Sequence, residues 1–199
     1  MSTVKYYDWS YHQARTRPNK VAVKEVSTGR ETTYGQLEER SCRLASWLQN
    51  KGVKKGDRVA ILIHNCTEVF ELEFACAKIG AIELPLNWRL TKPELEYILN
   101  DSSPEVLIYG SNFADTAKAL TKDCSIKNSL EIDDEDQNNE YEQALKENID
   151  FDVVETTHDD LIMLMYTSGT TGHPKGAMIT HEMQFYNIVN LAGSARVTD

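Results

Sequence analysis

Short apolar runs alternate with helix-like segments between residues 59 and 109, and this alternation limits the possible folds more than any other feature. Residues 59–63 are continuously apolar, a pattern typical of a strand covered on both faces. Repeated strand–helix units predict an α/β fold, with a largely parallel sheet flanked by helices. The expected elements are a helix over 68–78 that stops at Gly80, a strand over 81–85, a helix that begins near Pro93, and a strand over 105–109.

The two flanks of this region have their own patterns. Near the N-terminus we expect a short helix over 6–15, a hairpin of strands 21–23 and 31–34, and a long helix from Gly35 that ends at Gly52. Towards the C-terminus, an apolar strand over 161–165 precedes a Gly-rich loop. We expect a short strand over 177–180 and a helix from 181 to about 195, which Thr180 caps and which carries one apolar stripe.

The segment 131–140 is acidic and nearly free of apolar side chains. Carboxylates bind hard cations, so a metal site is one interpretation. A solvated connector outside the active site is the preferred one, since nothing in the spacing imposes a ligand geometry.

Length and charge narrow the class of protein. A chain of 199 residues is enough for one sizeable domain, and its net charge of −10 argues against nucleic acid or an anionic membrane as main partner. No apolar run approaches the ~20 residues of a membrane span, and the start does not resemble a signal peptide. The four cysteines have neither metal-like nor disulfide-like spacing, which favours a cytoplasmic location.

The loop over 166–176, Tyr-Thr-Ser-Gly-Thr-Thr-Gly-His-Pro-Lys-Gly, carries the chemistry. Glycines let the backbone turn successive N–H groups towards one anion, and hydroxyl donors can rotate to meet its oxygens. A lysine adds a mobile positive charge. These residue types predict a phosphate-binding loop, with ligands at Thr167, Ser168, Gly169, Thr170, Thr171, Gly172 and Lys175.

Two other interpretations of the loop fit less well. A Walker A motif needs Gly-Lys followed by Ser or Thr, whereas His173 and Pro174 separate Gly172 from Lys175, and Gly176 follows. A mobile Ser/Thr/Gly linker is the other alternative. Linkers rarely end in Gly-x-Pro-Lys-Gly directly after a buried strand.

The loop resembles the signature of the adenylate-forming enzymes, which include acyl-CoA synthetases, peptide-synthetase adenylation domains and luciferases. Every fixed position of that signature matches between Tyr166 and Gly176. The stretch from about 112 to 156 shows no matching motif. Upstream segments that resemble the family lie at 33–37, 56–61, 78–87 and 94–99.

The resemblance implies a two-step reaction. A carboxylic acid and ATP give an acyl adenylate and pyrophosphate, and the acyl group then passes to a thiol, most often that of CoA. The loop would restrain the β- and γ-phosphates, and Lys175 would act catalytically on the leaving pyrophosphate, with Mg²⁺ sharing the charge. Thr167 or a neighbouring hydroxyl could assist as a Mg²⁺ ligand, although no carboxylate motif completes a site.

The family's acyl pocket, adenine-binding segment, ribose-binding aspartate and C-terminal domain with its lysine have no counterpart up to Asp199. We therefore expect residues 1–199 to be the N-terminal portion of the AMP-binding domain, inactive alone and without a firmly bound cofactor. Exposed surfaces would favour a homo-oligomer. The alternatives are a non-catalytic nucleotide- or phosphate-binding module, an adenylation domain of another thioester-forming type, and an inert fragment. Fatty, aromatic and amino acids all remain possible substrates.

Four further side chains have a functional and a structural interpretation. His181 suits a base, yet a histidine in a first helical turn is commoner. Cys76 as a nucleophile lacks an activating neighbour in sequence. Trp88 and Arg89 suit packing and a turn better than substrate contact. Tyr166 either borders the pocket or packs behind the loop.

Overall fold

The computed structural model describes residues 4–133, 136, 138–146, 149–167 and 172–194. Within these ranges no helix has both the length and the apolar character that crossing a bilayer requires.

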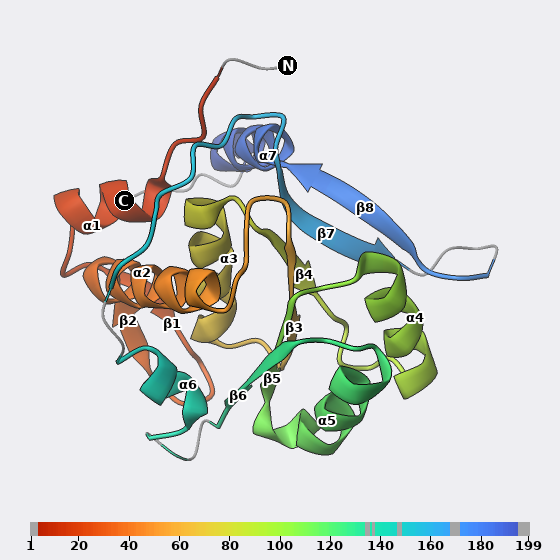
Figure 1. Cartoon of the computed structure of the whole chain (residues 1–199). Helices are drawn as coiled ribbons and strands as arrows, with labels where there is room; N and C mark the ends of the chain where they lie inside the picture. Colours follow the sequence, from red (N-terminus) through yellow and green to blue (C-terminus); the bar gives the residue numbers. More distant parts are fainter. Residues whose placement is uncertain (1–3, 134–135, 137, 147–148, 168–171, 195–199) are drawn as a thin grey trace.

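Six strands form the main sheet: β3 (Arg58–Leu62), β4 (Ile82–Pro85), β5 (Val106–Gly110), β6 (Asn128–Ile132), β7 (Leu161–Thr167) and β8 (Lys175–Thr180). Their order is β6-β5-β3-β4-β7-β8, and Figure 1 shows the last two as a hairpin that reaches past helix α4 (Lys92–Ser102). The first five strands are parallel and β8 is antiparallel to β7. The predicted α/β fold with a largely parallel sheet is confirmed.

Helices cover both faces of this sheet. On one face lie α2 (Tyr34–Asn50), α3 (Thr67–Ile79) and α6 (Glu140–Ala144), and on the other α4 and α5 (Ala114–Asp123). Strand β3 shows why its sequence is apolar throughout. Val59 and Ile61 belong to the core under α2 and α3, whereas Ala60 and Leu62 belong to the core under α4 and α5.

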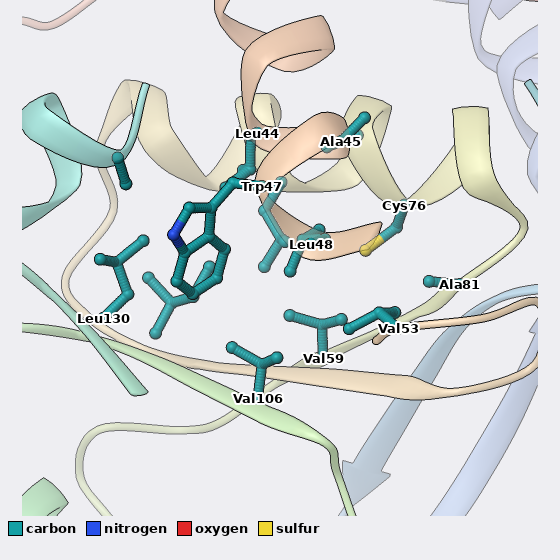
Figure 2. Close-up of a cluster of buried hydrophobic side chains, with 14 of the residues drawn as sticks. Leu44, Ala45, Trp47, Leu48, Val53, Val59, Cys76, Ala81, Val106 and Leu130 are labelled. Carbon is teal, nitrogen blue, oxygen red and sulfur yellow. The ribbon is translucent and has the colours of Figure 1, made fainter. Parts of the chain in front are cut away.

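The core under α2 is built around Trp47, which points from the helix towards the sheet (Figure 2). Leu44 and Leu48 flank it, and Val59 and Val106 meet it from the strands. All five side chains are buried. Each large apolar side chain buried in this way stabilises the fold by about 1.5–3 kcal/mol.

Local signals set the helix ends. Thr33 and Gln36 form a capping box at the start of α2, and Thr91 and Glu94 form another at the start of α4. Helix α3 ends at Gly80, as predicted, in a left-handed conformation with φ of 70°. A Cβ on Gly80 would lie 2.9 Å from Cγ of Lys55, so space also requires glycine there.

The first helix, α1 (Trp9–Thr16), starts three residues later than predicted. The carboxylate of Asp8 accepts a hydrogen bond from the backbone N–H of Tyr11 at 3.0 Å and fixes the helix start. Tyr6 is extended instead. Its N–H donates to the carbonyl of Thr156 at 2.9 Å, and its ring lies 4.4 Å from that of His181. The predicted hairpin is confirmed as β1 (Val21–Lys24) and β2 (Glu31–Thr33).

Residues 112–156 contain elements that the sequence pattern did not reveal, namely α5, β6 and α6. Strand β6 lies at the sheet edge and mixes polar residues with Leu130 and Ile132, so it lacks the apolar run of β3. The predicted acidic connector 131–140 begins inside this strand, where Ile132 is buried.

Two arginines tie α2 and the β1–β2 hairpin to α3 and α6. Arg40 of α2 forms ion pairs with Glu71 of α3 at 2.5 Å and with Glu142 of α6 at 2.6 Å. Arg30 pairs with Glu68 at 2.8 Å and also with Glu25. The side chains of Glu68 and Glu71 are 3% and 1% exposed, so these two carboxylates depend on their arginines for charge compensation.

The last helix, α7 (His181–Ser194), follows β8 as predicted. The hydroxyl of Thr180 accepts a hydrogen bond from the N–H of Met183 at 3.2 Å, which confirms the predicted cap. The expected apolar stripe is only partly covered. Phe185 is half-buried, whereas Ile188 and Val189 are exposed.

Candidate functional site

The predicted phosphate loop follows β7 at its carboxyl end and precedes β8. Strand β7 pairs with β4 only through Met163, so its last four residues run on with β8 as a two-stranded hairpin. Ligand sites of parallel sheets lie at the carboxyl ends of the strands, which is where this loop lies.

Thr167 and Lys175 are paired across the hairpin as its last partners. Two of the predicted phosphate ligands are therefore held side by side on antiparallel strands. The side chain of Lys175 is exposed, and no ion pair with it occurs among the residues described. Gly172 has a φ of 125°, a conformation that favours glycine. The other predicted ligands, Ser168, Gly169, Thr170 and Thr171, lie outside the described residues.

Gly176 lets the hairpin close over its own aromatic side chain. A Cβ at this position would lie 2.9 Å from Cδ1 of Leu164 and 3.2 Å from Cζ of Tyr166. The ring of Tyr166 thus packs against the strand that leaves the loop, as the packing interpretation of this residue expected.

Helix α4 holds the hairpin through two contacts. The hydroxyl of Tyr166 donates a hydrogen bond to the carboxylate of Asp101, and the ring of His173 stacks on that of Tyr97 at 4.5 Å with an interplanar angle of 16°. Tyr97 and Asp101 are four residues apart, so they lie on one face of α4. Sequence reasoning missed both residues, and their spacing is the only signal that could have pointed to them.

A second group of side chains gathers at the carboxyl ends of β3, β4 and β5. The ring of His64 lies 4.6 Å from that of Trp88 and 5.0 Å from that of Phe113. The guanidinium of Arg89 lies 4.0 Å above the Trp88 ring, and the Arg89 N–H donates to the side-chain oxygen of Asn87 at 3.0 Å. These contacts are the packing and turn that the sequence favoured for Trp88 and Arg89.

Two carboxyl groups, one half-buried and one buried, lie on the side of the sheet that α3 covers. Glu73 of α3 accepts a hydrogen bond from Gln184 of α7, and burial raises its pKa. Glu83 in β4 is completely buried, and neither of its oxygens has a hydrogen-bond partner among the described residues. Burial, with a smaller effect of Glu73, raises the pKa of Glu83 to about 8, so this carboxyl is mostly protonated at neutral pH.

His181 lies at the start of α7, where its N–H donates to the carbonyl of Asp160 at 3.0 Å. Burial lowers the pKa of its imidazole to about 4, so the ring is neutral at pH 7. No partner orients Nδ1 within the described ranges, and the ring packs on Tyr6. These contacts support the structural interpretation of His181.

The cysteines and the acidic segment lie away from the loop. Cys76 is buried, burial raises the pKa of its thiol, and all four cysteines are free. Asp133 and Asp136 line a cavity of about 420 Å³ with Arg30 and Glu68, on the sheet edge opposite β8. In the part of the chain that the structure describes, no three His, Cys, Asp or Glu side chains are grouped as a metal site.

The family model described as "AMP-binding enzyme" matches residues 10–198. The chain belongs to the AMP-binding enzyme family. This chain is 40% identical over 183 residues to a feruloyl-CoA synthase of Amycolatopsis sp. The match covers 92% of this chain and 35% of that protein. It is 38% identical over 180 residues to the long-chain-fatty-acid–CoA ligase FadD13 of Mycobacterium tuberculosis, or 90% of this chain and 36% of that protein.

The structures agree with the sequences. The inhibitor-bound N-terminal domain of FACL13 from Mycobacterium tuberculosis has a TM-score of 0.79 and 36% identity, over 90% of this AMP-binding chain and 45% of that domain. The chain thus has the fold of the N-terminal part of an acyl-CoA synthetase. It spans about a third of the length of the curated relatives that it matches.

Proposed function

We propose that this protein provides the N-terminal, phosphate-binding part of an ATP-dependent acyl-CoA synthetase. The reaction joins a carboxylic acid and ATP into an acyl adenylate with release of pyrophosphate, and then forms the thioester with CoA. The pairing of Thr167 with Lys175 at the carboxyl end of β7 is the observation that carries the proposal. Membership of the AMP-binding family supports it.

Lys175 is the proposed catalytic residue of this part. Its ammonium group is exposed beside Thr167 and is free to meet the β- and γ-phosphates of ATP and the pyrophosphate as it departs. Thr167, Ser168, Gly169, Thr170, Thr171 and Gly172 would supply the hydroxyl and backbone N–H donors around the same oxygens.

Mg²⁺ fits this loop as an ion carried by the substrate. Magnesium is often held by substrate phosphates with one or two protein ligands, and Thr167 offers a hydroxyl oxygen at the hairpin end. Bound there, the ion would neutralise phosphate charge. Lys175 and the N–H groups of the loop do the same from the protein side.

For the acid we propose only its chemical class, a carboxylic acid, and for the location only the cellular compartment. A feruloyl-CoA synthase and a long-chain-fatty-acid ligase are similar to this chain to nearly the same degree, so the likeness extends to carboxyl activation rather than to one acid. We place the protein in the cytoplasm, which four free thiols support. A carrier-protein thiol in place of CoA is a second candidate, since a fatty acid–[acyl-carrier-protein] ligase is also a relative.

Calorimetric titration of the 199-residue chain with pyrophosphate tests the role of the loop. We expect weak binding that Lys175→Ala abolishes and that Lys175→Arg partly keeps. The matched control is Lys118→Ala, an exposed lysine on α5. Unchanged affinity in Lys175→Ala would refute the assigned role.

Exchange of labelled pyrophosphate into ATP tests whether the chain acts alone. We expect no carboxylate-dependent exchange, because we propose only phosphate contacts for this chain and no site for the base or the sugar. Exchange by the purified chain would contradict this expectation. Pyrophosphate binding without exchange is also what a non-catalytic phosphate-binding module would show.

A further inference from the structure

Helix α4 contacts residues on both sides of the predicted phosphate ligands. On the β7 side, the hydroxyl of Tyr166 donates a hydrogen bond to the carboxylate of Asp101. On the other side, the ring of His173 stacks on that of Tyr97. Six of the seven predicted ligands are residues 167–172, which lie between these two contacts in the sequence. The segment that carries them is therefore held at both of its ends by one helix.

The main sheet gives the loop end of the hairpin no comparable support. Among the described residues, β7 pairs with β4 only through Met163, and β8 pairs only with β7. Figure 1 shows the hairpin reaching past α4 beyond this point. The position of the loop end thus depends on its contacts with the helix.

Helix α4 is itself firmly attached to the sheet. The guanidinium of Arg58, at the start of β3, donates to the carbonyl of Ser102 at 2.6 Å and to that of Ser103 at 2.7 Å. This attachment directly follows Asp101 in the chain. The inner side of the helix is buried in the core through Leu95, Ile98 and Leu99. A residue that Asp101 holds is therefore fixed relative to the sheet.

The contacts with α4 and the proposed ligands occupy opposite faces of the hairpin. Successive side chains of a strand point to opposite faces. Leu164 and Tyr166 pack against the core under α4, so Thr167 points away from it, as does its cross-strand partner Lys175. The helix can thus hold the hairpin and leave both ligands free for an anion.

The charge of Asp101 is unexpected beside a loop that is predicted to bind phosphate. A carboxylate near an anion site weakens anion binding by repulsion. As a hydrogen-bond acceptor, however, a carboxylate holds a phenol hydroxyl more strongly than a neutral group does. Burial, with a smaller effect of Asp101, raises the pKa of Tyr166, so its hydroxyl keeps the proton that it donates.

We propose that Asp101 is a positioning residue for the phosphate loop and acts through Tyr166, while Tyr97 holds the other end through His173. This inference rests on the proposed function of the loop. Holding both ends limits the conformations that the segment between them loses when an anion binds. Less of the binding free energy is then needed to order the loop.

Calorimetric titration of the 199-residue chain with pyrophosphate tests the role of Asp101. Asp101→Ala should weaken binding by about tenfold, although removal of a negative charge alone would strengthen it. Asp101→Asn also lacks the charge but keeps an oxygen that can accept the hydrogen bond, so it should bind within about threefold of the wild type. Asp115→Ala, at an exposed acid in the first turn of α5, is the matched control and should bind like the wild type.

A double-mutant cycle identifies Tyr166 as the residue through which Asp101 acts. Tyr166→Phe keeps the ring, removes the hydroxyl, and should weaken pyrophosphate binding as much as Asp101→Ala. The double variant should bind no more weakly than either single variant, because both remove the same hydrogen bond. The proposal is wrong if the two effects add, or if Asp101→Ala binds as tightly as the wild type or more tightly.

Hydrogen exchange without pyrophosphate separates this proposal from the proposed function. Asp101→Ala should speed exchange of the backbone amides of Thr167 and Lys175 by about tenfold, and Asp101→Asn should change it less. Unchanged rates in Asp101→Ala would refute the positioning role. A wild type that binds no pyrophosphate would instead refute the proposed function, and the exchange rates would still show whether Asp101 holds the loop end.

Discussion

His173 of the phosphate loop stacks on Tyr97 of α4, with ring centroids 4.5 Å apart. The loop is thus held from outside its own hairpin, at the residue two positions before Lys175. The stack on Tyr97 helps to position Lys175, whereas the charge belongs to Lys175 itself. Separate variants can therefore test the position and the charge.

Tyr97→Ala removes the stacking partner and leaves every loop residue in place. An aromatic pair of this kind contributes about 0.5–1.5 kcal/mol, so we expect pyrophosphate affinity to fall by up to about tenfold. Tyr97→Phe keeps the ring and should bind like the wild type. Equal affinities for the Ala and Phe variants in calorimetry would show that the stack does not position the loop.

Gly176→Ala places a methyl group within 2.9–3.3 Å of Leu164 and Tyr166. We expect this variant to lose about 1–3 kcal/mol in the free energy of unfolding, measured with urea. Ala177→Ser, at the exposed neighbouring position, is the control and should change stability little. A fully stable Gly176→Ala would mean that the Tyr166 ring does not pack there.

Glu83 predicts a pH dependence of stability. Its folded pKa of about 8 lies above the ordinary value of 4.5, so its contribution is most favourable below pH 4.5. That contribution is lost progressively as the pH rises to about 8, and the loss amounts to as much as about 5 kcal/mol. Glu83→Gln should remove this loss. The free energy of unfolding of the variant should therefore increase relative to that of the wild type between pH 5 and 8.

Urea unfolding at several pH values measures this difference. Glu140→Gln, an exposed acid at the start of α6, should keep a constant difference from the wild type. A constant difference for Glu83→Gln as well would mean that Glu83 is ionised in the folded protein.

Arg40→Met should destabilise the fold by about 3–5 kcal/mol, because it leaves the buried carboxylate of Glu71 without its cation. Adding Glu71→Gln should recover part of this loss in the same urea assay. Lys24→Met breaks the exposed pair with Glu31 and should cost less than about 1 kcal/mol. Equal losses for the two single variants would contradict the burial of the Arg40 pair.

The sequence predicted those elements whose signals are local. The apolar run at 59–63 and the stop at Gly80 needed no tertiary information, and both are confirmed. Strand β6 could not be found in this way. Its polar residues suit a strand at the edge of the sheet, so no apolar run marks it in the sequence. Its partner Val106 lies more than twenty residues away.

The residues of the candidate site also divide into those with a local sequence signal and those without one. Thr167 and Lys175 follow from the loop pattern, while Tyr97 and Asp101 reach it only through the docking of α4 against the hairpin. The burial of Glu83 was also invisible, since a glutamate within a short strand gives no sign of what covers it.

The extended segment around Tyr6 has a consequence for biosynthesis. Its backbone partners are Thr156 and Thr157, and its ring partner is His181, so all of them are made about 150 to 175 residues later. Contacts that close so long a loop form late. During translation the segment around Tyr6 therefore stays without these partners until residues 156–181 have left the ribosome.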